Sequence, residues 1–362
     1  MAETKEVTPE LIISANPHIR HPDTVPRIMS DVLIALLPAF VAAIYVSGLR
    51  AFTVTLVCVI GAVAGEAIVQ YLRGVTITID DGSAAVMGVL LAFCCPVTIP
   101  FWMAFLGSFL AIIVAKQAFG GLGNNPFNPA HIGRAFLLAS WPVALTTWVA
   151  VSKLATRLPY TNGGAIRYYD LWWNPFWDVN EINATLKGAG LDAVTEATPL
   201  ATLSSKIASG SGAGLVYARE TFWDAFVGTV GGCLGETSAL ALLLGAAFLF
   251  YRGHISWRIP VPMIGTVFFL TWFWIGDVTI ALFHLVIGGL MLGAFFMATD
   301  MVTTPVTKPG RIIFGIGCGI IVFLIRQFGA YPEGVCYSIL LMNAATPVID
   351  HYTRPKVFGA VK

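Results

Sequence analysis

The sequence predicts an all-α polytopic membrane protein with about ten transmembrane helices. Composition is the first observation behind this prediction. Of the 362 residues, 57% are hydrophobic and 11% are charged, and the mean hydropathy is +0.78. Soluble domains carry about 25% charged residues, so this chain has too few charges to cover a water-facing surface. The formal net charge of +1 argues against a nucleic-acid partner, which requires a broad basic surface.

The distribution of apolar residues is the second observation. A membrane-spanning helix needs about 20 apolar residues, with about 17 as a short limit. The runs at 83–95, 237–251 and 335–350 are shorter than this, so we expect half-helices or helices shielded by protein there. Apolar runs lie at about 30–49, 51–72, 83–95, 100–118, 132–151, 237–251, 259–276, 278–297, 311–327 and 335–350.

The positions of lysine and arginine are the third observation. With the N-terminus inside, ten spans place 13 of the 21 basic residues on the inner side, and only Arg50 and Arg326 in short outer loops. This bias predicts that both termini are cytoplasmic in a bacterial inner membrane. The chain then divides into an N-terminal segment (1–29), a first membrane repeat (30–151), an outer, periplasmic loop (152–236), a second membrane repeat (237–350) and a cytoplasmic tail (351–362).

Five runs before the loop and five after it predict that the second half is inverted in the membrane relative to the first. The halves share three landmarks in the same order: a threonine two residues before a proline, a Phe-Gly helix end, and an Asn/Pro-rich segment. Such repeats place a binding site near the middle of the membrane between the halves. The alternative is that these are ordinary breaks in membrane helices. The landmarks lie at 98–100, 119–120 and 124–130, and at 303–305, 328–329 and 343–347.

The six cysteines do not form a recognisable metal or disulfide pattern. No pair has C-x-x-C spacing, and Cys94 and Cys95 are adjacent, so that they would point apart on a helix. We therefore expect all six to pack as small apolar residues, and we expect no metal site.

The long loop contains a threonine at a predicted helix start. Thr198 precedes Pro199, and proline is favoured at the first helical position because its missing N–H costs nothing there. A helix N-terminus also favours an anion, so a phosphate esterified to the Thr198 hydroxyl would be well placed. Capping by an unmodified threonine explains the same pattern equally well.

Asp192, Thr195, Ala197 and Thr198 follow the spacing of a flavinylation motif, Asp-x-x-(Ser/Thr)-Gly-Ala-(Ser/Thr), although Glu196 replaces its glycine. Nearly the whole chain resembles the D subunit of the Rnf ion-translocating ferredoxin:NAD oxidoreductase complex. It is also similar to the B subunit of the sodium-pumping NADH:quinone reductase. The other features that carry this resemblance are Asn-Pro-His at 16–18, Asn-Pro-Phe-Asn-Pro-Ala at 125–130, Gly-Arg-Ala-Phe at 133–136, Gly-Glu-Thr-Ser at 235–238 and Met-Ala-Thr-Asp at 297–300.

The resemblance implies a urea-transporter-like fold of two inverted five-helix repeats. It also implies that a flavin transferase attaches FMN through its phosphate to Thr198, beside Asp192, Thr195, Ala197 and Pro199. That FMN would relay electrons on the outer side of the membrane. The implied partners are the A, B, C, E and G subunits of the Rnf complex, and the G subunit is the closest in function because its FMN is the donor.

A second, noncovalent flavin, riboflavin, is also implied by the resemblance. We expect it at the Asn-rich segment, because Asn124, Asn125 and Asn128 offer donors and acceptors suited to the edge of an isoalloxazine ring. The alternative is that these asparagines cap the ends of broken helices.

Ionisable residues in membrane spans are costly and are therefore functional candidates. We rank Glu66, Glu236 and Asp300 as candidates for the path of a translocated Na⁺ or H⁺. For Glu66, the alternatives are helix-end capping or pairing with a buried arginine. We expect no catalytic residue, and no NAD or ferredoxin site on this chain, because the sequence has neither a nucleotide-binding fingerprint nor a cluster of cysteine ligands.

The favoured function is a redox subunit that carries flavin and helps to couple electron flow to ion movement. A channel or transporter for a small polar solute is the alternative, suggested by Asn128-Pro129-Ala130, which resembles the aquaporin signature. The corresponding segment, Asn343-Ala344-Ala345, does not repeat that signature, and a pore gives no reason for the long loop. A scaffold without a cofactor would require Thr198 to be unmodified.

Overall fold

A computed structural model of the protein describes residues 23–148, 173–176, 198–208, 212–228, 231–329 and 333–355. Within these residues the chain is helical and contains no β-strand; one isolated bridge joins Pro96 to Cys233. The predicted fold class is therefore correct at the level of an all-helical chain. The boundary that we predicted at 151–152 lies outside the described residues.

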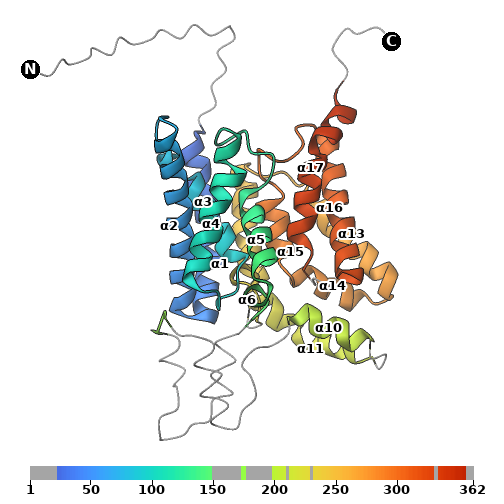
Figure 1. The fold of residues 1–362 in the computed structure, drawn as a ribbon. Helices are drawn as coiled ribbons and strands as arrows, with labels where there is room; N and C mark the ends of the chain where they lie inside the picture. Colours follow the sequence, from blue (N-terminus) through green and yellow to red (C-terminus); the bar gives the residue numbers. More distant parts are fainter. Residues whose placement is uncertain are drawn as a thin grey trace, which may run out of the picture.

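The helices follow the predicted apolar runs (Figure 1). The first half contains α1 (Val25–Ser47), α2 (Leu49–Leu72), α3 (Ser83–Phe93), α4 (Phe101–Ala115), α5 (Pro129–Ser140) and α6 (Pro142–Leu145), with short 3₁₀ turns η1 (Ile79–Asp81) and η2 (Gln117–Phe119). The later part contains α10 (Pro199–Ala208), α11 (Ala213–Val227), η3 (Leu234–Glu236), α12 (Ala239–Arg252), α13 (Pro260–Ile275), α14 (Val278–Val286), α15 (Leu290–Leu292), the π-helix η4 (Gly293–Met297), α16 (Lys308–Phe328) and α17 (Val335–Thr353).

Fewer helices qualify as membrane spans than the ten apolar runs suggest. Among the described residues, four helices are long and apolar enough to cross a membrane: Val25–Ser47, Leu49–Leu72, Phe101–Phe119 and Lys308–Phe328. Helix α14 and the following segment Leu290–Met297 form a pair bent by 65°, which gives a fifth span if the pair is counted as one.

The three marginal runs have different outcomes. Helices α3 and α12 are short apolar helices of 11 and 14 residues, as the short runs at 83–95 and 237–251 predict. Helix α17 has 19 residues, so of the two alternatives expected for the run at 335–350 it is not a half-helix. The apolar run underestimated this helix because its last turn carries polar residues such as Asp350 and His351.

Glycines create the sharpest breaks. Gly288 and Gly289 have φ values of +70° and +67°, and they separate α14 from α15 at the bend. This region of the backbone is costly for residues with a Cβ atom, so two successive glycines allow a span to break in its interior. The break leaves backbone carbonyl groups that need partners inside the protein.

The two halves repeat one packing pattern. Helix α2 packs against α3 and α4, and α4 packs against α5; in the second half, α13 packs against α14 and α16, and α16 packs against α17. Across the halves, α1 contacts α12 and α5 contacts α17. In each half, therefore, the second helix lies against the third and the fourth, and the fourth lies against the fifth.

Small residues allow the corresponding helices to approach closely. A Cβ atom on Gly61 of α2 would lie 2.7 Å from the Phe105 carbonyl oxygen of α4. A Cβ atom on Gly319 of α16 would lie 2.8 Å from the Met263 carbonyl oxygen of α13. Glycines four residues apart, as at 61 and 65 or at 315 and 319, are typical of close packing between membrane helices.

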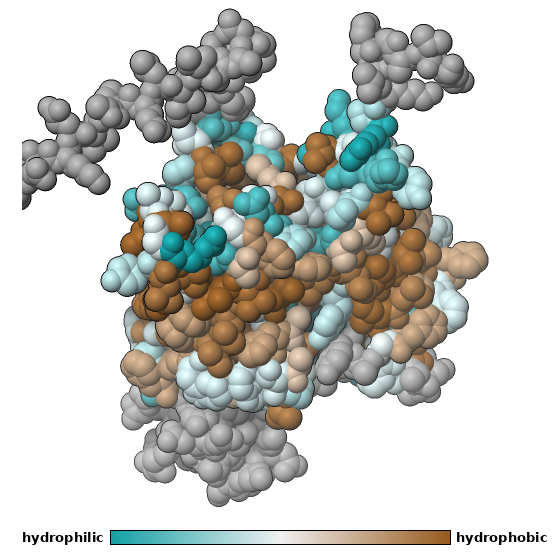
Figure 2. Space-filling view, turned by 45° about the horizontal axis from the view of Figure 1, so that its top comes forward, coloured by the Kyte–Doolittle hydropathy of each residue, from teal (hydrophilic) through white to brown (hydrophobic). Residues whose placement is uncertain are grey.

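The bundle has two ends. Helix α1 begins and α17 ends at the terminal side, at the top of Figure 1, whereas α10 and α11 lie across the opposite end, the loop side. Figure 2 shows a broad band of hydrophobic residues around the middle of the visible face, with hydrophilic residues toward the terminal side. Helices α10 and α11 are held against α14 by an apolar cluster of Leu200, Leu203, Ala218, Ala225, Ile280, Phe283 and Ile287.

Four of the basic residues that we counted toward one side of the membrane are buried inside the protein. Lys116 is 2% exposed, Arg134 is 5% exposed, and Arg50 and Arg326 are each 6% exposed. Counting them toward a side is wrong because hydropathy cannot reveal a distant partner inside the protein. Since Arg50 and Arg326 were the two outer-loop charges, setting all four aside strengthens the charge bias between the two sides.

Candidate functional site

Thr198 marks the start of α10. Its hydroxyl oxygen accepts a hydrogen bond from the backbone N–H of Ala201 (3.2 Å), and Pro199 is the first residue of the helix. These contacts confirm the predicted N-cap. Asp192, Thr195 and Ala197, the other residues that we assigned to the flavin motif, lie outside the described residues.

The Thr198 side chain borders a small cavity on the loop side. Glu236, Gly288 and Glu333 also line this cavity, whose volume is about 20 Å³. Such a space holds about one water molecule. Thr198 itself is 3% exposed. The residues fit a phosphoester at the start of a ten-residue helix, where backbone N–H groups face an anion, but any ring system attached there must lie outside this cavity.

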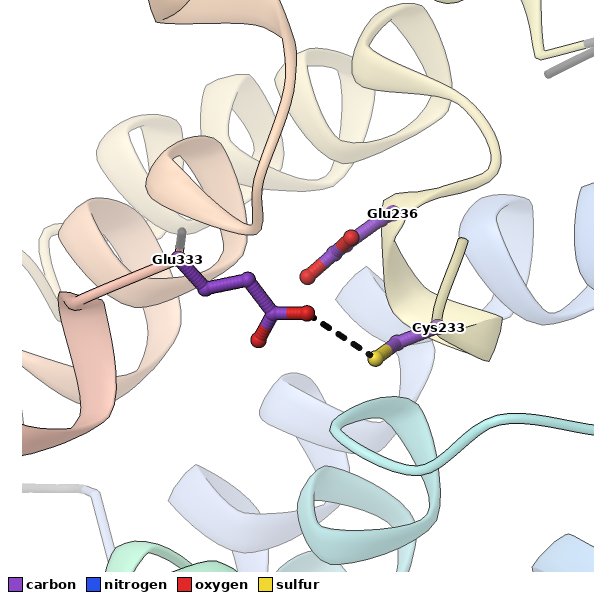
Figure 3. A group of neighbouring side chains, drawn as sticks. All are labelled: Cys233, Glu236 and Glu333. Carbon is purple, nitrogen blue, oxygen red and sulfur yellow. Dashed lines mark hydrogen bonds between the residues drawn. The ribbon is translucent and has the colours of Figure 1, made fainter. Parts of the chain in front are cut away.

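A polar cluster lies next to Thr198 and joins the two halves. We call Arg134, Cys233, Glu236 and Glu333 the loop-side cluster. Figure 3 shows the Glu236 and Glu333 carboxylates and the Cys233 thiol directed toward one another. Arg134, on α5, forms an ion pair with Glu333 and donates a hydrogen bond to the Cys233 sulfur (3.4 Å). The Cys233 thiol is 3.9 Å from Glu333 Oε1.

The loop-side cluster has the residue types of a metal site but not its electrostatics. Ligand atoms of Cys233, Glu236 and Glu333 lie within 4.8 Å of one another. The Arg134 guanidinium already pairs with Glu333 and donates a hydrogen bond to the Cys233 sulfur, so two of the three possible ligand groups already have a cationic partner within the protein. We therefore assign it no metal.

All six cysteines are free and buried, as expected. Cys233 nevertheless differs from the predicted apolar packing residue, because its sulfur accepts a hydrogen bond from Arg134. Glu236 was predicted as a site residue, whereas Arg134 and Glu333 were not. Arg134 could have been predicted from the sequence, because it lies inside the apolar run at 132–151. An arginine in a membrane span is a functional candidate for the same reason as a carboxylate there.

A larger cavity of about 140 Å³ opens between the two halves near the terminal side; we call it the terminal cavity. Both halves contribute to it, and its polar lining includes Ser83, Lys116, Asn125, Asn128, His254, Thr299 and Asp300. The terminal cavity thus lies between the two halves, as the inverted-repeat argument expects of a binding site, but toward the terminal side of the bundle.

The Asn-rich segment contributes two of its three asparagines to this cavity. Asn128 caps α5, since its side-chain oxygen accepts from the Ala130 N–H (3.0 Å), and its amide donates to the Met297 carbonyl (3.3 Å). Capping, the alternative interpretation, therefore applies to Asn128. The Asn125 side-chain oxygen is buried without a hydrogen-bond partner among the described residues. Asn124 is exposed and does not line the cavity.

A free acceptor in a cavity lined by both halves fits the edge of a flavin ring. The Asn125 oxygen is that acceptor, and apolar side chains such as Met87 and Phe296 provide the surrounding surface. The chemistry of this lining is therefore compatible with a flavin ring, and Asn124 does not contribute to it.

Glu66 pairs with a buried base, but the base is a lysine. Glu66 Oε1 accepts hydrogen bonds from Lys116 (2.6 Å), Gln117 (2.9 Å) and Gln70 (3.1 Å). Glu66 Oε2 is buried without a hydrogen-bond partner among the described residues. Lys116 belongs to the lining of the terminal cavity, so Glu66 is connected to that cavity through its ion pair.

Asp300 also faces the terminal cavity. Its carboxylate accepts hydrogen bonds from the Thr303 hydroxyl (3.2 Å) and from the Val302 N–H (3.4 Å). The three carboxylates that we ranked for an ion path thus separate into two places. Asp300 lines the terminal cavity and Glu66 lies behind Lys116 at its edge, whereas Glu236 lies in the loop-side cluster.

A sequence model of the NQR2, RnfD, RnfE family matches residues 12–359. The chain is 45% identical to the D subunit of the "Proton-translocating ferredoxin:NAD(+) oxidoreductase complex" of Clostridium ljungdahlii, over 99% of each chain. It is 44% identical to the D subunit of the "Na(+)-translocating ferredoxin:NAD(+) oxidoreductase complex" of Acetobacterium woodii, over 97% of this chain and 96% of the relative. It is 38% identical to the D subunit of the "Ion-translocating oxidoreductase complex" of Cronobacter sakazakii, over 96% and 98%. The chain therefore belongs to the NQR2, RnfD, RnfE family.

Proposed function

We propose that this chain is a membrane subunit of an ion-translocating electron-transport complex, which couples ferredoxin and NAD redox chemistry to cation movement. The names of its relatives support this assignment across nearly the full chain. Oxidation of ferredoxin and reduction of NAD take place on partner proteins, which we infer to be the A, B, C, E and G subunits of an Rnf complex. The chain itself supplies cofactor attachment, electrostatics and part of the ion path.

The Thr198 hydroxyl at the N-terminus of α10 is the observation that carries the cofactor proposal. A flavin transferase would esterify this hydroxyl with the phosphate of FMN. Bound FMN supplies one-electron and two-electron transfer. Thr198 holds the phosphate at the helix start, where backbone N–H groups and the helix dipole stabilise its negative charge. Arg134 and Arg326 also lie near this end of the bundle, together with the carboxylates of Glu236 and Glu333.

The loop side is the outer, periplasmic side of an inner membrane in this proposal, and both termini are cytoplasmic. The distribution of lysine and arginine along the sequence supports this orientation. It places the FMN on Thr198 outside the membrane, within reach of the G subunit. It also opens the terminal cavity toward the cytoplasm.

We propose ten membrane-embedded helices in two inverted five-helix repeats, with a urea-transporter-like arrangement. The matching packing of α2, α3, α4 and α5 with α13, α14, α16 and α17 supports this proposal. Short α3 and the broken α14–α15 pair stand at corresponding places, as half-helices do in inverted-repeat transporters.

The terminal cavity is the proposed site of the second flavin, riboflavin. Asn125 would accept a hydrogen bond from the ring, and Asn128 would shape the wall while it caps α5. A flavin here would lie between the two repeats and beside the carboxylate of Asp300.

A solute pore gains no support from the asparagines at the centre. With its amide group oriented to satisfy its neighbours, Asn343 accepts from the Asn128 N–H (3.2 Å) and donates to the Thr303 carbonyl (3.3 Å). Asn128 and Asn343 are both buried, and helix α17, which contains Asn343, is not broken there. This contact joins the halves instead of lining a passage.

Fluorescence of the denatured protein band tests the proposal. We expect the band to fluoresce under ultraviolet light when a flavin transferase is co-expressed, because a phosphoester survives denaturation. Without the transferase the band should be dark. A wild-type band that is dark in both cases would reject the covalent cofactor.

Substitution of the ion-path carboxylates should separate pumping from cofactor content. We expect Glu236→Gln or Asp300→Asn, assembled in the complex, to slow cation uptake into proteoliposomes more than it lowers bound flavin. The reason is that each change removes one negative charge and leaves Thr198 and Asn125 unaltered. Equal losses of uptake and flavin would instead indicate misfolding.

A further inference from the structure

Lys116 stands between a buried carboxylate and the terminal cavity. It follows the last residue of α4, and its Nζ lies 2.6 Å from Glu66 Oε1 and 2.6 Å from the Ser83 hydroxyl oxygen. The residue is 2% exposed, yet it contributes to the lining of the cavity. Lys116 therefore separates Glu66 from the space between the two halves.

The surroundings of the Lys116 ammonium group have the chemistry of a monovalent-cation site. Its acceptors are a carboxylate oxygen and a hydroxyl oxygen, and the second Glu66 oxygen is buried without a partner among the described residues. Oxygen ligands of this kind suit hard cations. A carboxylate oxygen that lacks a partner is costly in a buried site and favours the arrival of another cation or proton.

Two further charged residues border this site. Asp81 accepts a hydrogen bond from the Ser83 hydroxyl (2.5 Å), and Arg73 donates to the Gln117 carbonyl (2.9 Å). Asp81 adds negative charge on the α3 side, and Arg73 adds positive charge on the η2 side. The site around Glu66 and Lys116 therefore has no large excess of either sign.

The second half carries a basic residue at the corresponding position, with a different environment. Lys116 is followed by Gln-Ala-Phe-Gly, and Arg326, near the end of α16, is followed by Gln-Phe-Gly. Arg326 donates to four backbone carbonyls, those of His284 (2.5 Å), Ile287 (3.0 Å), Gly288 (3.1 Å) and Glu333 (3.3 Å). The rigid guanidinium is thus fixed at the break between α14 and α15.

Unlike Arg326, Lys116 has a side chain whose chemistry suits the exchange of one hydrogen-bond acceptor for another. Lysine is a compact charge on a flexible four-carbon chain, and its acceptors here are side chains instead of a ring of carbonyls. The terminal cavity offers a further acceptor on the other side, the carboxylate of Asp300. The ammonium group therefore has oxygen acceptors both at Glu66 and in the cavity.

We propose that Lys116 is a tethered cation that occupies the site of the coupling cation beside Glu66, and that it leaves this site by moving toward Asp300. The exchange balances because the arriving cation replaces Lys116 as the partner of Glu66, while the displaced ammonium group pairs with the Asp300 carboxylate. Lys116 is thus a positioning residue that sets how readily a cation reaches Glu66. This inference rests on the proposed ion-translocating function.

The test compares Lys116→Met with wild type in the assembled complex in proteoliposomes. Electron transfer from ferredoxin to NAD is measured while NaCl is titrated, and the titration is repeated over a range of pH. Methionine has a similar length and no charge, so a cation no longer competes with the ammonium group. We expect half-maximal activity at an Na⁺ concentration lower by about tenfold or more. If protons are the coupling ion, the pH profile should move upward by about one unit or more instead.

Two controls keep the test decisive. Lys308→Met removes an exposed lysine at the start of α16 and should shift neither titration. The double variant Lys116→Met/Glu66→Gln removes the buried pair together, so it guards against misfolding from one unpaired charge, and it should lose the saturable cation dependence.

Unchanged Na⁺ and pH titrations in Lys116→Met, with normal flavin content, would overturn the tethered-cation inference and leave the proposed function intact. A wild-type complex that transfers electrons without moving any cation would instead reject the proposed function itself. A double variant that keeps wild-type cation dependence would also overturn the inference, because Glu66 would then not be the site.

Discussion

Thr198→Val should abolish the fluorescence of the denatured protein band and stop electron transfer through the assembled complex. Valine has nearly the shape of threonine but lacks the oxygen that a phosphoester requires. Loss of the N-cap hydrogen bond from Ala201 costs about 1 kcal/mol, which is too little to unfold the bundle. The variant should therefore reach the membrane in normal amounts while carrying no covalent flavin.

Two further substitutions serve as controls for the Thr198→Val result. Thr198→Ser keeps a hydroxyl at the start of α10 and should retain the fluorescent band. Thr195→Val removes the other hydroxyl of the motif and should leave a fluorescent band, although attachment can become slower if the transferase reads this residue. A fluorescent Thr198→Val band would place the flavin on another residue and contradict the assignment.

Arg134→Met should cause the largest loss of stability of any single change in the loop-side cluster. The Arg134 and Glu333 side chains are 6% and 15% exposed, and their ion pair joins α5 to the segment before α17. Removing one partner of a buried pair costs about 3–5 kcal/mol, because the other charge remains buried without compensation. We expect a clearly lower melting temperature for the purified protein in detergent.

The double variant Arg134→Met/Glu333→Leu is the control for this prediction. Replacing both members of a buried pair by apolar residues is often neutral, so most of the lost stability should return. A single variant as stable as wild type would show that Glu333 is satisfied by water or by other groups. A double variant as unstable as the single one would mean that packing around Arg134, and not the charge pair, holds the halves together.

Hydropathy predicted where the helices lie because the membrane requires long apolar segments with satisfied backbones. Most apolar runs correspond to one helix, from α1 at Val25–Ser47 to α17 at Val335–Thr353, whereas the run at 278–297 is divided by the break between α14 and α15. Local chemistry also predicted the cap at Thr198, since it depends only on the residues that follow. Motifs that act within one turn of helix are readable from the sequence.

Long-range pairs were not readable in the same way. Lys116 pairs with Glu66 fifty residues earlier, and Arg134 pairs with Glu333 on the other side of the long loop. Lys116 and Arg134 lie within the apolar runs at 100–118 and 132–151, but the sequence did not indicate a partner for either base, and the packing of α4 and α5 buries them. The terminal cavity was equally hidden, because it forms only where Asn125 of one half meets Asp300 of the other.

Mass spectrometry of the tryptic peptide 188–206 from the native protein tests the central claim most directly. This peptide lies between Lys187 and Lys206 and contains Thr195, Thr198 and Thr202. The account predicts added mass equal to FMN less one water, with fragment ions that localise it to Thr198. An unmodified peptide from mature protein, or a modification localised to Thr195 or Thr202, would contradict it.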